Sequence, residues 1–505
     1  MEFKEHDIRI LFIYPEFPAT FWSFKHALRF VNKKSALPPL GILTISSMLP
    51  AAWEKRLVDC NVRMLRDEDI LWSDMVFISG MTVQKESAQS IIDRVKTFGK
   101  TIIAGGPLFT TGYEEFKNVD CFVLNEGEVT VPLFLEDWEN GGMKHVYTSD
   151  EKPGIENTPL PDWDLIHVND YLNLSVQFSR GCPFSCEFCD IIIMNGRIPR
   201  TKTTSQMIAE FDAIYAKGWK GGVFIVDDNF IGNKNKVKDL LKNIKVWMKE
   251  KKYPFTLFTE ASINLAQDEE LMMLMREANF DNVFIGIETP DENALKSCDK
   301  IQNQNINMID SIKTIQRNGM AVMGGFIVGF DTDTPKIFDR MVQFIQKSGV
   351  VTAMVGLLNA LPKTKLHERL SSEGRLLDKP SSGNNTDSSI NFLPKMDLDV
   401  LVNGYRNILE QLFTPRNYYK RITTFLKEYS PFVKGKKKHI PLFKSIKILN
   451  YSLFKFGFLD KGRFYFWKMF FWALIRKPYL LADVLSYTIS GFHCRKVLME
   501  SFKKE

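Results

Sequence analysis

Three cysteines stand close together near the middle of the 505-residue chain. Cys182, Cys186 and Cys189 follow the spacing Cys-x3-Cys-x2-Cys, and the glycine, proline and serine around them indicate a loop. This spacing is too tight for disulfides among the three, but it suits thiolates at three corners of one iron-sulfur cube. The fourth iron would then have no protein ligand, and an open metal position is where a cosubstrate binds. We predict a catalytic iron-sulfur centre here.

Two other interpretations of these cysteines explain less. A zinc knuckle would need a fourth cysteine or histidine at short spacing, and the nearest histidine, His167, lies upstream of the motif. A chance grouping of core cysteines does not account for the loop-forming residues between them. The cluster interpretation is therefore preferred.

An aromatic residue, Phe188, directly precedes the third cysteine. The resulting pattern, Cys-x3-Cys-x-aromatic-Cys, resembles the signature of the radical S-adenosylmethionine (SAM) enzymes. The resemblance implies a [4Fe-4S] cluster whose open iron is chelated by the amino and carboxylate groups of SAM. It also implies that an electron from the cluster cleaves SAM to a 5′-deoxyadenosyl radical, which abstracts hydrogen from a substrate.

From residue 174 on, apolar runs that predict strands alternate with stretches that predict helices. Six parallel strands in this part of the chain predict a partial (β/α) barrel whose strand-end loops hold the active site. The predicted strands are 174–178, 222–226, 256–259, 282–287, 321–328 and 352–358. The cluster loop follows the first of them.

Polar residues and glycines end the later strands, where a cosubstrate would need them. A carboxylate there can accept hydrogen bonds from ribose hydroxyls, and glycine lets adenine approach the backbone. The resemblance places Asp227, Asp228 and Asn229, at the end of the second strand, near the SAM amino group. The alternative, that any one of them only caps a helix or makes a turn, stays open. The candidate SAM-binding residues are Phe188, Asp227, Asp228, Asn229, Glu260, Glu288, Gly325 and Gly329.

The N-terminal part also alternates strands with helices, which predicts a doubly wound, Rossmann-like parallel sheet. Its predicted strands are 8–14, 56–58, 75–79, 101–104 and 121–124, with helices at 40–49 and 85–98. Ligands of such sheets bind at the carboxyl ends of the strands. The candidate residues there are Ser79, Gly80, Gly105, Gly106, Glu126 and Gly127.

A plain nucleotide-binding domain is one alternative for this sheet, but no Gly-x-Gly-x-x-Gly opens its first helix. With Pro38-Pro39-x-Gly41, the arrangement resembles the cobalamin-binding domain that precedes the radical domain in one radical SAM subfamily. The chain lacks the Asp-x-His-x-x-Gly motif that supplies a histidine ligand in many cobalamin proteins. The subfamily often holds cobalamin without such a ligand, so the resemblance implies cobalamin as a third cofactor.

Length and composition place these parts in a larger plan. A chain of 505 residues predicts more than one domain. Seven cysteines without a paired pattern, and no apolar signal peptide, indicate a reducing cytoplasm. The net charge of +6 is too small to indicate nucleic acid as a partner. We predict a cobalamin-binding-like domain at 1–140, a linker at 141–170, a radical SAM barrel at 171–370, a helical extension at 371–433 and a basic, aromatic tail at 434–505.

The tail contains two stretches, 464–475 and 479–492, that are rich in aromatic and aliphatic residues. Each is shorter than the roughly 20 residues that span a bilayer. Aromatic side chains flanked by lysine and arginine are typical of helices at a membrane surface. We therefore predict contact with the inner face of the membrane; the alternative is a hydrophobic helical cap on the barrel.

From residue 11 to about 419 the chain resembles the cobalamin-type radical SAM group that contains the bacterial hopanoid methylase. The matching segments are 177–183, 226–232, 271–277, 285–290 and 360–364. The resemblance implies that one SAM methylates cobalamin while a second supplies the radical, so that an unactivated carbon gains a methyl group. The expected substrate is a hopanoid or other membrane lipid or small molecule, and the expected reductant is a flavodoxin or ferredoxin.

Three other functions remain as alternatives. Radical carbon-carbon bond formation or rearrangement on a lipid would release no S-adenosylhomocysteine. Methylthiolation of tRNA typically needs a second cysteine trio in the N-terminal domain, where only Cys60 and Cys121 are available. A non-catalytic, membrane-associated binding protein is disfavoured by the intact trio.

Overall fold

The computed structural model describes residues 8–379, 381–384, 386–432 and 442–502, without the side chains of 442–445. The start of the predicted tail, 434–441, thus lies outside the described residues. The chain forms two compact units. The first comprises Met1–Ala19, Lys33–Val176 and Arg200–Trp219, and the second comprises Thr20–Asn32, Gln177–Pro199 and Lys220–Glu505.

The first sheet has six parallel strands in the order β2-β1-β3-β4-β5-β6, which confirms the predicted doubly wound sheet. Apolar runs without alternation form its central strands because both faces are covered. The strands are β1 (Arg9–Tyr14), β2 (Glu54–Asp59), β3 (Met75–Ser79), β4 (Thr101–Gly105), β5 (Cys121–Val123) and β6 (Val146–Tyr147). The short edge strand β6 was not predicted.

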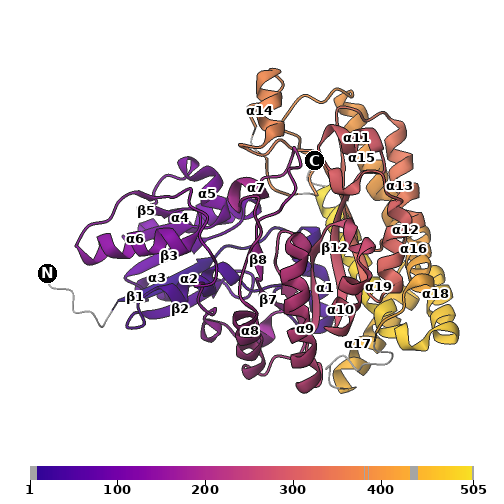
Figure 1. Ribbon diagram of the computed structural model, residues 1–505, viewed down its shortest axis with the longest axis horizontal. Helices are drawn as coiled ribbons and strands as arrows, with labels where there is room; N and C mark the ends of the chain where they lie inside the picture. The colour runs from indigo at the N-terminus through magenta and orange to yellow at the C-terminus, as the bar shows by residue number, and fades with distance from the viewer. Residues whose placement is uncertain (1–7, 380, 385, 433–441, 503–505) are drawn as a thin grey trace. The chain divides into compact units, whose positions relative to one another are not determined.

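Helices cover both faces of this sheet (Figure 1). Helices α3 (Asp67–Trp72), α4 (Lys85–Thr97) and α5 (Pro107–Gly112) pack on one core, and α2 (Leu40–Met48) and α6 (Gly127–Glu139) on the other. Helix α8 (Thr204–Ala216) also belongs to this unit. Its short helices are η2 (Thr82–Gln84), η3 (Tyr113–Glu115), η4 (Trp163–Leu165) and η5 (Val168–Asp170).

The second sheet has the order β14-β13-β12-β11-β10-β7, and its strands from β10 to β14 pair in parallel. This confirms the predicted partial barrel of six strands. The strands are β7 (Asn173–Val176), β10 (Gly222–Ile225), β11 (Thr256–Ala261), β12 (Phe280–Glu288), β13 (Ala321–Val328) and β14 (Ala353–Leu357). Along β10 and β11 fully buried residues alternate with partly exposed ones, so one face packs on helices and the other stays accessible.

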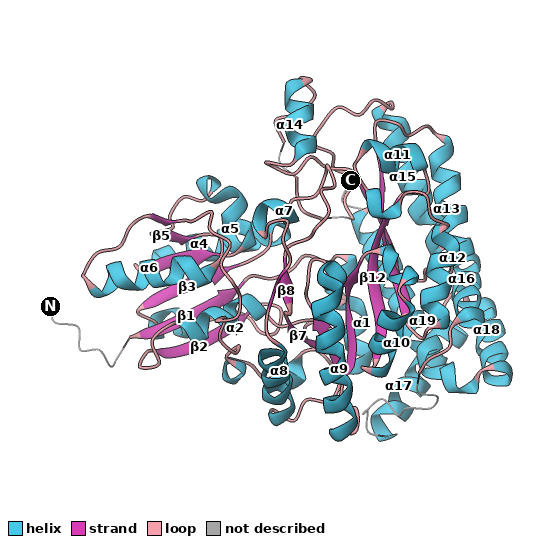
Figure 2. Cartoon of the chain, viewed as in Figure 1, coloured by secondary structure: helices cyan, strands magenta, loops and turns pink. Residues whose placement is uncertain are grey.

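Figure 2 shows helices in cyan beside the magenta strands of this sheet. The helices that connect the strands are α9 (Lys234–Glu250), α10 (Glu269–Glu277), α11 (Glu292–Ser297), α12 (Met308–Arg317) and α13 (Lys336–Ser348). Shorter elements of this unit are β8 (Ser179–Arg180), α7 (Ile191–Met194), η6 (Phe230–Asn233), η7 (Ile263–Gln267), η8 (Ile301–Asn303) and α14 (Lys365–Ser372), while β9 (Arg200–Thr201) belongs to the first unit.

The C-terminal part of the second unit is helical. Its elements are α15 (Leu398–Phe413), α16 (Pro415–Glu428), α17 (Leu442–Phe454), the π-helix η9 (Lys455–Leu459), α18 (Arg463–Arg476), η10 (Pro478–Leu480) and α19 (Leu481–Ser501). Helix α18 packs on α16, with Phe466 against Tyr419, and its buried residues are Phe466, Met469 and Ala473. No helix among the described residues has both the length and the apolar composition needed to cross a bilayer.

An early segment of the chain packs against these last helices. Residues 20–32, with η1 (Phe21–Ser23) and α1 (Lys25–Val31), lie in the second unit. Buried His493 on α19 donates from Nε2 to the carbonyl oxygens of Thr20 and Phe21, at 3.0 and 3.1 Å. The ring of Phe30 stacks on that of Phe456. Segment 20–32 is therefore fixed by residues more than four hundred positions away in the sequence.

Candidate active site

The cysteine loop is closed by its own backbone. Cys182 donates its N–H to the carbonyl of Gly196, at 3.2 Å, and Cys189 donates to that of Cys186, also at 3.2 Å. Gly181 has a φ of +98°, and a Cβ there would lie 2.9 to 3.0 Å from three carbonyl oxygens of residues 195 to 198. Only glycine fits this position, so the loop depends on the residue just before the first cysteine.

Two aspartates that follow β10 hold the start of this loop. Asp227 accepts hydrogen bonds from the Phe178 N–H and the Ser179 hydroxyl, at 2.8 and 2.6 Å. Asp228 accepts from the Gly181 N–H, at 2.7 Å, and from the side chain of Asn195. Burial raises the pKa of Asp227 to about 7, against the lowering effect of these hydrogen bonds. Both residues were predicted near SAM, and the structure shows their carboxylates bonded to residues 178–181, which lead into the cysteine loop.

Polar side chains reach two of the cysteine sulfurs. The amide of Asn229 lies 3.9 Å from Cys182 Sγ, and the amide of Gln302 lies 3.7 Å from Cys186 Sγ. Burial raises the pKa of Cys182, and it raises the pKa of Cys189 to about 12. A bound iron would reverse this because a coordinating thiol is deprotonated.

This donor set fits a cluster rather than a single ion. No three histidine, cysteine or acidic side chains among the described residues meet closely enough to hold one metal ion. A four-iron cube takes one thiolate at each of three corners, so its ligands surround a larger group. Three thiols on a short closed loop, two of them with N–H donors near the sulfur, match that requirement.

The outer side of the loop is tied to the end of the barrel. Glu187 accepts from Arg369 at 2.6 Å, and Arg369 also donates to Asp331 at 2.8 Å. Arg375 completes the network by pairing with Asp331. The Glu187 N–H donates to the carbonyl of Cys298. Residues far apart in sequence thus fix the loop that carries the cysteines.

The remaining predicted SAM residues lie at the strand ends with differing surroundings. Glu260 ends β11, and burial raises its pKa to about 8. Glu288, at φ +64°, forms a buried ion pair with Lys300, whose Nζ lies 2.6 Å from its carboxylate. Gly325 lies against Phe284, and a Cβ there would come within 2.9 Å of that ring. Glu288 therefore has a partner already, while no described residue donates a hydrogen bond to Glu260.

Two further residues stand near these. Gly329 has a φ of +108°, and its N–H donates to Asp333 at 2.8 Å. The ring of Phe188 lies 6.1 Å from that of Phe330 in an edge-on arrangement. The contact between these two rings places the exit of β13 beside the cysteine loop.

In the first unit, the predicted glycines form one edge of the sheet. Ser79 and Gly105 are partners in the β3-β4 register. A Cβ on Gly105 would lie 2.6 Å from the Val123 carbonyl oxygen, whereas one on Gly80 would meet nothing closer than 3.4 Å. Gly106, at φ +89°, would bring a Cβ within 2.3 Å of Ser79 Oγ. The strand ends thus lie side by side with bare backbone at their tips.

The two predicted residues after β5 have internal partners. Glu126 is buried and accepts two hydrogen bonds from Arg200, at 2.8 and 2.6 Å. Gly127 begins α6, where a Cβ would lie 2.5 Å from Ile45 on α2. Both residues therefore shape the edge through contacts within the unit.

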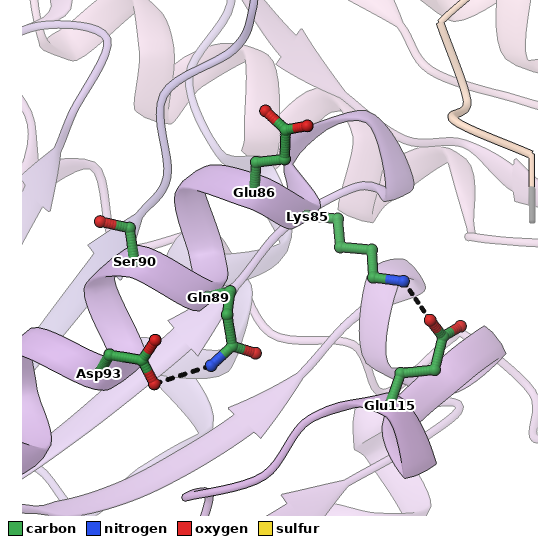
Figure 3. Close-up of a pocket in the computed structure, with 6 residues that line it drawn as sticks. All are labelled: Lys85, Glu86, Gln89, Ser90, Asp93 and Glu115. Carbon is green, nitrogen blue, oxygen red and sulfur yellow. Dashed lines mark hydrogen bonds and ion pairs between the residues drawn. The ribbon is translucent and has the colours of Figure 1, made fainter.

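A surface pocket on α4 and η3 is a separate feature of the first unit (Figure 3). None of the residues that line it was predicted as a site residue, and they are charged or polar. Lys85 pairs with Glu115 there, and Gln89 donates to Asp93 at 2.9 Å. None of these six residues has an apolar side chain that could bind a lipid.

Lys300, Gln302 and Arg369 were missed by sequence reasoning. Each is a single polar residue outside any motif, and only the fold brings it to the cysteine loop. Asp331 followed a predicted strand end, which was the one available signal for the Arg369 network.

Comparison with known proteins supports this arrangement. Residues 29–135 match the B12 binding domain, residues 176–345 the Radical SAM superfamily, and residues 364–505 a domain of unknown function, DUF4070. The chain is 44% identical to the uncharacterized methyltransferase sll1242 of Synechocystis sp., over 96% of this chain and 91% of that protein. It is 34% identical to the hopanoid C-2 methylase of Rhodopseudomonas palustris, over 93% of this chain and 90% of that protein.

A solved structure shares the fold. The cobalamin-dependent S-adenosylmethionine radical enzyme OxsB, with aqua-cobalamin and S-adenosylmethionine bound, matches 99% of this chain and 84% of its own with a TM-score of 0.62. At 15% identity this likeness concerns the fold alone. The chain therefore belongs to the cobalamin-dependent radical SAM methyltransferase family that includes the hopanoid C-2 methylase, and it is an enzyme that uses a [4Fe-4S] cluster, SAM and cobalamin.

Proposed function

We propose that this enzyme methylates an unactivated carbon of a hopanoid or another membrane lipid. The observation that carries the proposal is the accessible face of the second sheet. Phe224, Phe258 and Phe284 all lie at partly exposed positions of β10, β11 and β12. The rings of Phe224 and Phe258 stack in parallel at 4.7 Å. Such a face favours a large, rigid, apolar molecule.

Two further contacts extend this aromatic face. Trp22, from segment 20–32, is 42% exposed and lies 5.4 Å from Phe284, centroid to centroid. Glu260 pairs with Phe284 in the β11-β12 register and lies two residues beyond Phe258, hence on the same side of the sheet. A polar group thus stands beside the apolar wall, as it would in a site that holds a cosubstrate next to a lipid. The hopanoid C-2 methylase among the relatives agrees with that class of substrate.

The residue assignments follow from these positions. Cys182, Cys186 and Cys189 would hold three irons, and Asn229 would orient the first thiolate. Glu260 would bind a polar group of SAM. When bound, the cluster and SAM supply the hydrogen-abstracting radical, and cobalamin supplies the methyl group.

Further residues complete the assignment. Asp227 and Asp228 support the loop that bears the cysteines, and the aromatic face excludes water from the reacting carbon. The remaining proposed contacts to SAM are Phe188, Glu288, Gly325 and Gly329, and those to cobalamin are Ser79, Gly80, Gly105, Gly106, Glu126 and Gly127.

An anaerobic assay tests the function. The chain, loaded with iron, sulfide and cobalamin, is given SAM, a strong reductant and a hopanoid, and the products are identified by mass spectrometry. We expect one S-adenosylhomocysteine and one 5′-deoxyadenosine for each methyl group added to the lipid. Deoxyadenosine without S-adenosylhomocysteine would instead support rearrangement or carbon-carbon bond formation.

We further propose that the enzyme works in the cytoplasm at the inner surface of the membrane, with a low-potential flavodoxin or ferredoxin as electron donor. All seven cysteines are free thiols, in agreement with a reducing compartment. Helix α18 carries exposed apolar side chains, and we call Phe464, Phe471, Leu474 and Ile475 its apolar surface. Lys468 and Arg476 are exposed on the same helix, and its sequence contains no acidic residue. This combination fits an anionic lipid surface.

Co-sedimentation with vesicles tests the membrane contact. The full chain should bind vesicles of phosphatidylcholine with phosphatidylglycerol more tightly than vesicles of phosphatidylcholine alone. Phe464→Ser with Ile475→Ser should weaken binding at least tenfold, because each large side chain contributes roughly 1.5–3 kcal/mol when fully buried in lipid. Met64→Ser, which removes an equally exposed apolar residue from the first unit, is the matched control. Equal binding by all three chains would refute the contact.

A further inference from the structure

A buried cation lies beside the cysteine loop. The ammonium of Lys300 lies 5.9 Å from the centroid of the Phe188 ring, the residue just before Cys189. The Lys300 side chain is only 12% exposed. Its Nζ lies 2.6 Å from the Glu288 carboxylate, and this buried ion pair favours the charged form of the lysine. The lysine is therefore charged and weakly screened by water.

The backbone around Lys300 is shaped to hold it there. A Cβ on Gly286 would lie 2.9 Å from Lys300 Nζ and 2.4 Å from the Glu288 carboxylate, so glycine makes room for the ion pair. Asn303 donates to the carbonyls of Gly286 and Ile287, both at 3.0 Å, which fixes η8 against the end of β12. Gln302, within η8, sends its amide to Cys186 Sγ.

We propose that Lys300 and Gln302 set the reduction potential of the cluster. The inference rests on the proposed assignment of the three cysteines as its ligands. Reduction adds one electron, taken from an external low-potential donor, and so adds one negative charge to the cluster. A nearby buried ammonium and an N–H donor to a ligand sulfur stabilise the more negative state. Both residues act through the cluster and are positioning residues.

Glu288 opposes this effect. Its carboxylate lies 2.6 Å from Lys300 Nζ and therefore neutralises part of the positive charge near the cluster. Removing Lys300 and removing the Glu288 charge should therefore change the potential in opposite directions. A purely structural ion pair predicts no such opposition, since loss of either partner would disturb the loop in the same way.

The test is a redox titration of the reconstituted cluster, followed by electron paramagnetic resonance, without SAM or lipid. Lys300→Met should lower the ratio of reduced to oxidised cluster at least tenfold at a fixed potential, which is 59 mV for a one-electron couple. Gln302→Leu should lower the ratio by a smaller factor, and Glu288→Gln should raise it. Lys300→Arg should restore most of the ratio.

Lys296→Met provides the matched control, because Lys296 is 57% exposed on α11, four residues before Lys300. Its potential should equal that of the unaltered chain. Equal potentials for Lys300→Met and the unaltered chain at equal iron content would overturn the inference. If Lys300→Met does not assemble a cluster, Gln302→Leu and Glu288→Gln decide. Shifts of the reduction potential in opposite directions support the inference, and shifts in the same direction or none overturn it. An unaltered chain that takes up no iron overturns the cysteine assignment itself.

Discussion

Substituting alanine for two glycines at the same sheet edge separates backbone packing from ligand approach. Gly105 and Gly80 end neighbouring strands, and neither has a positive φ. At Gly105 the added Cβ would lie 2.6 Å from the Val123 carbonyl oxygen, a backbone atom that moves only if β5 moves. At Gly80 the nearest atom lies 3.4 Å away, which is ordinary contact.

The expected sizes follow from these distances. Gly105→Ala should destabilise the chain by about 1–3 kcal/mol, the usual range for overpacking. For a unit of this size that lowers Tm by roughly 2–12 °C, at about 2–4 °C per kcal/mol. Gly80→Ala should stay within about 0.5 kcal/mol of the unaltered chain. If cobalamin lies against this edge, however, Gly80→Ala should weaken cobalamin binding because its methyl group projects where the ligand would approach.

Two measurements suffice: thermal unfolding of the cobalamin-free chain by circular dichroism, and titration with cobalamin followed by absorbance. Equal Tm for the two variants would refute the packing argument. Unchanged cobalamin affinity in Gly80→Ala would refute the placement of the cofactor at this edge. Each result concerns a different step, so one can fail while the other stands.

Three other predictions concern ionisable side chains and their partners. Arg200→Met removes the cation that gives the buried Glu126 carboxylate two hydrogen bonds and should cost about 3–5 kcal/mol in urea denaturation, most of it recovered by adding Glu126→Gln. Burial raises the pKa of Asp227 from 3.8 to about 7, so the stability from its retained proton is complete below about pH 4 and is lost as pH rises through 7. In Asp227→Asn, the fall in Tm between about pH 5 and about pH 8 should be shallower; an unchanged slope would contradict this. Arg369→Met removes the cation that ties Glu187 to the barrel and should speed the loss of iron to a chelator, while Glu368→Gln, at an exposed position of the same helix, should not.

Much of the fold could be predicted because its strands are long runs of apolar residues. A buried parallel strand such as β3 carries that signal in four successive apolar, buried residues, 75–78. Strand β6, with two residues, has too little sequence to carry it, and only pairing with β5 defines it. The helices of the tail were predicted from composition, but which face packs on α16 depends on contacts that composition does not contain.

The candidate site was predicted in its residues better than in its geometry. The cysteine spacing and the strand-end positions are local features, so they could be found along the chain. The direction of a carboxylate is not local: Asp227 and Asp228 point back to the cysteine loop because the N–H groups of Phe178 and Gly181 lie there. For the same reason Lys300, a single lysine after a short helix, gave no signal.

The attachment of segment 20–32 to α19 has a consequence for synthesis on the ribosome. Thr20 meets His493, 473 residues later, so the segment cannot complete its packing until almost the whole chain has been made. At roughly 5–20 residues per second, that interval lasts from about half a minute to a minute and a half. The sheet of the first unit can form during this time. The rings of Phe21 and Phe30 stay exposed until their partners, Phe413 and Phe456, have been made. The nascent chain therefore exposes an apolar segment, to which chaperones can bind until the C-terminal helices cover it.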